Sequence, residues 1–97
     1  MQIKIPHNLS AEQATSRIKN LLDKIKNGSN NTITNINQTW DGNVNKFSFT
    51  AKGLSVSGDM QVNPSLIIVN LKLPLAAMLF RGKIKSIIEE EAKKVLS

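Results

Sequence analysis

The sequence predicts an α+β domain, in which an antiparallel sheet of four to five strands carries two helices in the order β-α-β-β-β-β-α. Apolar and polar residues alternate along several short segments, a pattern typical of half-buried strands. Turn signals such as Asp41-Gly42 separate these segments. Two other stretches carry apolar residues three or four positions apart, as amphipathic helices do. A chain of 97 residues buries one core, so residues 1–97 form a single domain.

The first strand and the first helix are predicted near the N-terminus. Residues 2–5 alternate, and Pro6 ends the strand. Ser10 and Gln13 have the spacing of a capping box, which starts a helix. We expect this helix to end near Asn27-Gly28, where glycine can adopt the left-handed conformation of a helix cap. Its apolar stripe consists of Ala14, Ile18, Leu21, Leu22 and Ile25.

Four further strands are predicted to follow. They cover residues 34–40, the segment around Phe47 and Phe49, residues 54–62 and residues 66–73. Glycine accepts the positive φ of a tight turn, so Asp41-Gly42 predicts a hairpin between the first two. Gly58 stands where an inward apolar residue is expected, which suggests a bulge or the close approach of a helix.

The C-terminal part is predicted to be helical and to cover the sheet. Pro74 fits the first position of a helix, because its missing amide costs nothing there. Arg81-Gly82 is expected to kink or break the helical stretch, and a clear amphipathic pattern runs from Lys83 onward. We expect one buried cluster that contains Ile18, Leu21, Leu22, Trp40, Phe47, Phe49, Val56, Met60, Ile84, Ile88 and Val95.

Residues 75–80 are apolar on every side of a helix, which is more than one core face requires. Burial at the end of the sheet is the simpler interpretation. The alternative is an adhesive patch for a hydrophobic surface, a protein partner or a second copy of the chain. In that case the expected contacts are Leu75, Met78, Leu79 and Phe80, bordered by Arg81, Lys83 and Lys85. These cations favour a solvated helix face, or an anion site if a helix restarts at Gly82.

The residue types argue against catalysis and against bound cofactors or metals. The chain has no cysteine and a single histidine, His7, so it lacks a thiolate nucleophile and a histidine-built metal site. Its aspartates lie on separate predicted elements, with no spacing that pairs two carboxylates. A packing or hydrogen-bonding role at the corner between strand and helix is the favoured interpretation of His7. We therefore expect a protein that is not an enzyme.

The formal net charge of +6 suits an acidic partner, but it also simply keeps a small protein soluble, and the lysines are scattered. Nucleic acid is disfavoured as a partner, because Phe47 and Phe49 alternate with polar residues as core positions do. No apolar run approaches the roughly 20 residues that span a bilayer, and no secretory signal is recognisable. A cytoplasmic location is the expectation.

Several short signatures recur through the chain in a fixed order. They are Pro6-His7-x-Leu9, Trp40-Asp41-Gly42, Phe49, Gly53 and Gly58, Leu73-Pro74, Phe80-x-Gly82-Lys83-Ile84 and Ile88-Glu89-x-Glu91. As a set they resemble the bacterial polyhydroxyalkanoic acid system family over residues 3–96. The Asn-rich stretch 27–37 and the spacing of the two glycines depart from the family pattern.

The resemblance implies an accessory role in storage-polyester metabolism, at the granule surface or with granule-associated proteins, and no catalytic residue. Two alternatives stay open. A curved sheet closed by a C-terminal helix is broadly similar to helix-grip folds, which hold an apolar ligand between sheet and helix. A basic module that binds anions or nucleic acid would rest on the net charge alone.

Overall fold

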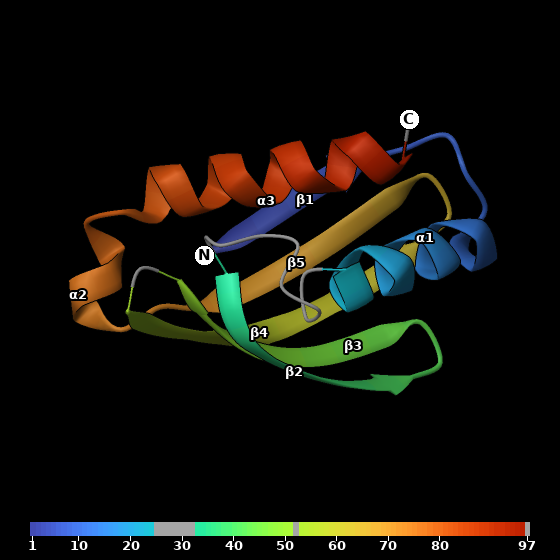
Figure 1. Ribbon diagram of the computed structural model, residues 1–97. Helices are drawn as coiled ribbons and strands as arrows, with labels where there is room; N and C mark the ends of the chain where they lie inside the picture. Colours follow the sequence, from blue (N-terminus) through green and yellow to red (C-terminus); the bar gives the residue numbers. More distant parts are fainter. Residues whose placement is uncertain (25–32, 52, 97) are drawn as a thin grey trace.

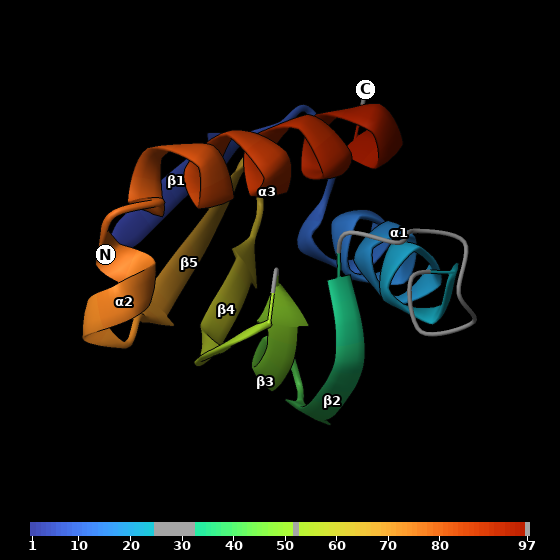
Figure 2. The same ribbon diagram turned by 60° about the vertical axis from the view of Figure 1, so that its left-hand side comes forward.

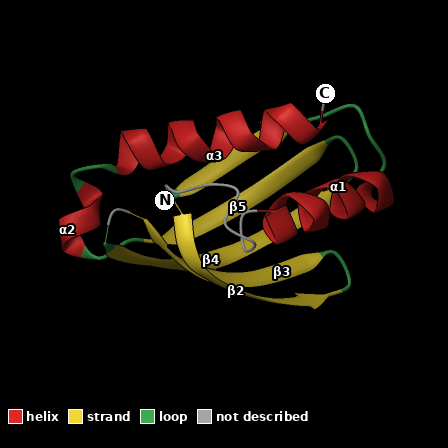
Figure 3. Ribbon diagram, viewed as in Figure 1, coloured by secondary structure: helices red, strands yellow, loops and turns green. Residues whose placement is uncertain are grey.

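The computed structural model describes residues 1–24, 33–51 and 53–96 and shows a five-stranded sheet with helices on one face (Figures 1 and 3). All neighbouring strands are antiparallel, in the spatial order β1-β5-β4-β3-β2. The elements are β1 (Gln2–Pro6), α1 (Ala11–Lys24), β2 (Ile33–Asp41), β3 (Val44–Ala51), β4 (Leu54–Asn63), β5 (Leu66–Lys72), α2 (Leu75–Met78) and α3 (Arg81–Leu96). The predicted α+β class and element order are confirmed, with a short helix added before the last one.

Local signals account for the helix start and the first hairpin. The amide of Gln13 donates to Ser10 Oγ at 3.1 Å, and the Ser10 amide donates to Gln13 Oε1 at 3.4 Å, which is the predicted capping box. Gly42 has a φ of 60° in the turn between β2 and β3, as the hairpin prediction requires. The helix end predicted at Asn27-Gly28 lies outside the described residues.

Both α1 and α3 cover the same face of the sheet (Figures 1 and 2). The most deeply buried positions come from β1, β5 and β4, the three neighbouring strands on one side of the sheet, which contribute alternate residues. The opposite face is polar, and Asn70 there donates to Asp59 Oδ1 at 3.0 Å. The largest fully buried apolar side chains are those of Ile3, Ile5, Ile67, Val56, Val62 and Val69.

The predicted core was correct in its choice of face but wrong in its extent of burial. Ile18, Val56 and Ile84 are buried. The other predicted positions are only partly buried, because α1 packs mainly against β4 and α3 mainly against β1, and the two helices diverge between them. These half-buried residues are Leu21, Leu22, Trp40, Phe47, Phe49, Met60, Ile88 and Val95.

Three local predictions are corrected. Gly58 closely approaches the backbone of the neighbouring strand β5, not a helix, and the pairing of β4 continues through it without a bulge. The irregularity of the sheet lies in β2 between Thr34 and Asn37, where Asn35 has a φ of 54°. Pro74 is the N-cap of α2 rather than its first helical residue.

One buried polar side chain lacks a hydrogen-bond partner within the described parts of the chain. Asn45 is 0% exposed, and neither Oδ1 nor Nδ2 is paired. It lies two residues before Phe47 on β3, so strand alternation directs it to the same, helix-covered face. Burying an unpaired amide carries a desolvation cost that a hydrophobic side chain of similar size does not have.

We expect Asn45→Leu to raise the free energy of unfolding by about 1 kcal/mol in urea melts, because it removes both unpaired groups. Asn43 is the matched control, since its Nδ2 donates to the carbonyl of Val62 at 2.9 Å. Asn43→Leu should lower the free energy of unfolding by about 1 kcal/mol, because it leaves that carbonyl unpaired. Destabilisation by Asn45→Leu would contradict the unpaired state of Asn45.

Candidate functional site

The chain leaves the sheet after β5 and forms the single helical turn α2. Pro74 caps this turn with φ −64° and ψ 159°. The amides of Ala77 and Met78 donate to the Pro74 carbonyl at 2.9 and 3.2 Å, and the Phe80 amide donates to the Ala77 carbonyl at 2.9 Å. The proline has a preset φ and no amide to pair in a sheet, so β5 ends and the chain turns here. The result is a compact, hydrogen-bonded projection at one end of the sheet (Figure 1).

The apolar side chains of this projection are exposed. Leu75 and Leu79 are each 86% exposed, Phe80 is 47% and Met78 is 45% exposed. Ala77 alone among the α2 residues is buried. The interpretation that residues 75–80 fill the end of the core is therefore wrong for the large side chains. A single helical turn presents only one side to the sheet, and in α2 the methyl group of Ala77 occupies that side. We name Leu75, Met78, Leu79 and Phe80 the α2 patch.

Basic side chains border the α2 patch. Arg81, Lys83 and Lys85 are exposed and lie in the first turns of α3, and we name them the basic rim. The predicted break at Arg81-Gly82 is corrected: the chain turns at Leu79 and Phe80, and α3 begins at Arg81. The first turn of α3 contains no acidic residue. Cations at a helix start oppose the helix dipole, so helix stability does not explain the basic rim.

A groove of about 510 Å³ joins the α2 patch to the basic rim. Met1, Leu73 and Met78 contribute apolar surface, and Arg81 and Lys85 contribute positive charge. The N-terminal ammonium group, which donates to the Leu71 carbonyl at 3.0 Å, adds a further charge nearby. Sequence reasoning missed Met1 and Leu73, because only the pairing of β1 with β5 brings the N-terminus to this end of the sheet.

The large apolar side chains exposed in the described residues all belong to this end of the molecule. They are Met1, Leu75, Met78, Leu79 and Phe80. Isolated exposed apolar residues are normal on protein surfaces, but a contiguous group is typical of an interaction site. Of the predicted contacts, the groove brings together Met78, Arg81 and Lys85 and adds Met1 and Leu73. The other predicted contacts are exposed but do not line the groove; they are Leu75, Leu79, Phe80 and Lys83.

His7 and the acidic residues that the sequence offered as candidates are spread over the fold. Within residues 1–24, 33–51 and 53–96, no three His, Cys, Asp or Glu side chains gather in a way that could hold a metal ion. Glu12 and Asp23 lie on α1, whereas Asp41 ends β2 and Asp59 lies on β4. His7 is buried, and both of its ring nitrogens are engaged with backbone groups.

The aromatic side chains do not form an open platform for nucleic-acid bases. The rings of Phe47 and Phe49 stack on each other, with centroids 5.9 Å apart and an interplanar angle of 15°. Both pack against the core on the helix-covered face. The Lys19 ammonium lies 5.1 Å from the centre of the Trp40 ring, an intramolecular cation–π contact.

Comparison with known proteins identifies the family. The model of the family described as "Putative polyhydroxyalkanoic acid system protein" (PHA_gran_rgn) matches residues 1–96. The chain belongs to this family. The match spans the sheet, all three helices and the α2 patch, so the polyhydroxyalkanoic acid system assignment applies to the whole fold. No curated protein and no solved structure matches the chain.

None of the helices in the described parts of the chain combines the length and the hydropathy that crossing a bilayer requires.

Proposed function

We propose that this chain is a non-enzymatic, cytoplasmic accessory protein of the polyhydroxyalkanoic acid system that adheres to the polyester granule surface through the α2 patch. The observation that carries the proposal is the 86% exposure of both Leu75 and Leu79 beside two further apolar side chains. The family assignment supplies the hydrophobic surface that such a patch would meet.

Hydrophobic burial provides the driving force. Removing a leucine side chain from water stabilises a complex by about 2 kcal/mol. Leu75 and Leu79 have most of that surface available, and Phe80 and Met78 about half of theirs. Association also costs translational and rotational freedom, so the net affinity is lower than the sum of these contributions. A reversible attachment follows, and many copies can cover one granule.

The basic rim would strengthen attachment to a surface that carries negative charge. Near an anionic surface each lysine or arginine adds about 1 kcal/mol, and the attraction falls off within a Debye length. Arg81, Lys83 and Lys85 are exposed and lie directly after the patch in the chain. The rim therefore predicts weaker attachment at higher ionic strength.

Co-sedimentation with purified polyhydroxybutyrate granules tests the proposal. The double variant Leu75→Ser, Leu79→Ser should weaken the affinity for granules at least tenfold, measured from the bound fraction over a range of granule concentrations, because about 1.4 kcal/mol of lost burial suffices for that change. Its melting temperature should stay within a few degrees of the wild type, since both side chains are exposed. Ala76→Ser is the matched control on the same exposed turn and should bind like the wild type.

Two outcomes would count against the proposal. A folded double variant that still sediments with granules would show that the contact lies elsewhere. A wild-type protein that binds no granules but forms dimers lost in the double variant would assign the patch to a second copy of the chain.

Replacing Arg81, Lys83 and Lys85 by glutamine should remove the dependence of granule attachment on ionic strength. The apolar contribution of the α2 patch to attachment should stay in place.

A further inference from the structure

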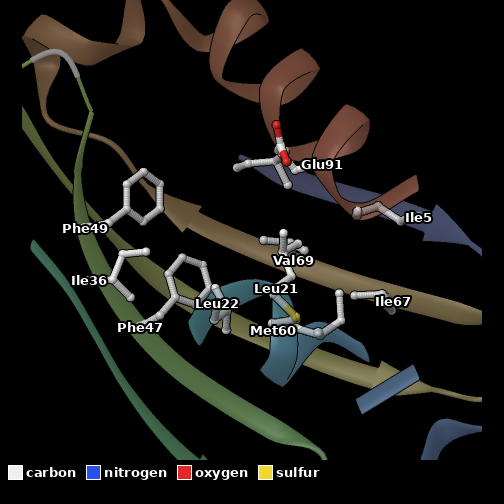
Figure 4. A pocket seen from close by; sticks show the side chains of 13 residues that line it. Ile5, Leu21, Leu22, Ile36, Phe47, Phe49, Met60, Ile67, Val69 and Glu91 are labelled. Carbon is white, nitrogen blue, oxygen red and sulfur yellow. The ribbon is translucent and has the colours of Figure 1, made fainter. Parts of the chain in front are cut away.

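A second apolar feature lies inside the molecule, between the sheet and the helices. It is a cavity of about 80 Å³, open on one side and lined by residues of α1, α3 and all five strands. Figure 4 shows Phe47, Phe49, Met60, Leu22 and Val69 converging on it. The cavity is separate from the groove at α2, with which it shares no lining residue.

The arrangement of the helices explains why this space is not filled. Midway along α1 (Ala11–Lys24), Arg17 Nη1 donates to the carbonyl of Val95 near the end of α3 at 3.0 Å. Toward the end of α1, Leu21 and Leu22 stay partly exposed, and Ile88 on α3 does too. The two helices thus meet at one end and diverge over β3 and β4 (Figure 2).

Half-buried aromatic and aliphatic side chains in a concave site favour the binding of an apolar ligand. Phe47, Phe49 and Met60 face the helix-covered side yet keep part of their surface accessible. Burying that surface under an apolar ligand would be favourable at about 25 cal/mol per Å². Small-molecule sites are typically concave, mostly apolar and largely preformed, as this one is.

The lining determines what kind of ligand fits. Among the described residues that line the cavity, only Glu91 has a polar side chain. Figure 4 shows its carboxylate turned away from the labelled apolar side chains, so these lining residues present an apolar interior. A cavity of about 80 Å³ is smaller than the about 150 Å³ that hold a benzene ring in an engineered core, so it admits only part of a ligand, such as the end of a chain that leaves through the open side.

Charge at the rim of the cavity restricts the head group. Glu91 lies there with its carboxylate 3.5 Å from the Lys94 ammonium, which partly neutralises it. A carboxylate head on a ligand would face like charge, whereas a hydroxyl head could donate a hydrogen bond to Glu91. The two residues together favour an uncharged donor group.

From this geometry we infer that the cavity binds the hydrocarbon end of a linear aliphatic ligand whose head group is an uncharged hydrogen-bond donor, of the aliphatic-alcohol class. The chain end lies between Phe47, Phe49, Met60 and Val69, and the head stays at the rim near Glu91. This site is independent of granule attachment through the α2 patch, so either can fail without the other.

Methyl-detected NMR titration with hexan-1-ol tests the site. The shifts should saturate and concentrate on Ile5, Ile67, Val69, Leu21 and Leu22, which line the cavity. Val69→Phe should weaken binding at least tenfold, because the larger ring occupies the space of the chain. Ile68→Phe is the matched control on the opposite face of the same strand and should bind like the wild type.

A comparison of two ligands tests the preference for an uncharged head group. Hexanoate should bind several-fold more weakly than hexan-1-ol, and Glu91→Gln should reduce that difference. The double variant Leu75→Ser, Leu79→Ser should bind hexan-1-ol normally, which separates this site from the α2 patch. If Val69→Phe does not fold, Ala92→Leu fills the same cavity from α3 and takes its place.

Three results would overturn the inference. The first is the lack of any saturable shift of the cavity methyl groups. The second is a folded Val69→Phe or Ala92→Leu variant that binds hexan-1-ol as tightly as the wild type. The third is shifts confined to residues 75–80, which would assign the alcohol to the α2 patch.

Discussion

Gly58→Ala should lower the free energy of unfolding by about 3 kcal/mol, the largest stability loss expected from so small a change. A Cβ atom at this position would lie 2.0 Å from the Asn70 carbonyl oxygen and 3.1 Å from Leu71 Cα. Both are backbone atoms of β5, the strand paired with β4 at this point. Neither can move without breaking the pairing of Ser57 with Lys72 and of Asp59 with Asn70.

Urea denaturation of the purified variant measures this effect. Gly82→Ala is the matched control, because Gly82 lies in α3 and a Cβ there meets nothing within 4 Å. Alanine has the higher helix propensity, so this control should be neutral or more stable by about 0.5 kcal/mol. A loss below about 1 kcal/mol for Gly58→Ala would show that β4 and β5 are less closely apposed at this position.

His7→Ala should lower the free energy of unfolding by about 2 kcal/mol, because it removes the hydrogen bonds that the His7 ring makes with two part-buried backbone groups. The Leu9 amide donates to His7 Nδ1 at 3.0 Å, and His7 Nε2 lies 2.8 Å from the Asn63 carbonyl oxygen. A ring that accepts at Nδ1 and donates at Nε2 is the neutral Nε2-protonated tautomer. His7 thereby fastens the corner between β1 and α1 to the turn between β4 and β5.

Two conservative variants separate the hydrogen bonds of His7. Asparagine places its oxygen close to the Nδ1 position and can keep the local bond from Leu9. Glutamine reaches closer to the Nε2 position and can keep the bond to Asn63. Each should recover part of the free energy of unfolding lost in His7→Ala. Granule attachment and hexan-1-ol binding should both persist in every folded His7 variant. A specific loss of either activity without a stability change would contradict the purely structural role.

The local elements could be predicted because short-range rules determine them. Ser10 and Gln13 cap α1 wherever the helix lies in the fold, and Gly42 supports a tight turn whatever surrounds it. Alternation along β3 correctly placed Phe47 and Phe49 on the face that the helices cover. The family signatures also depend on local positions, so the sequence pattern over residues 3–96 already resembled the family whose model matches residues 1–96.

The candidate site was predictable in its composition but not in its exposure. The α2 patch and the basic rim stand out in the sequence because residues 75–80 lack a polar face and three cations follow. That pattern is compatible with burial of these side chains in the core and equally with their exposure on the surface. The structure decided between them, because Ala77 alone fills the available space against the sheet and the larger side chains have nothing to cover them.

What the sequence determined by itself is the set of elements and the apolar face of each. Only the tertiary structure decided what lies against those faces. It placed Met1 beside Met78, it brought the β5 backbone onto Gly58, and it left a cavity beside Phe49. The physical reason is that periodicity reports which side of a helix or strand avoids water. Whether another element reaches that side depends on strand order and helix divergence, which are set by contacts between residues far apart in the chain.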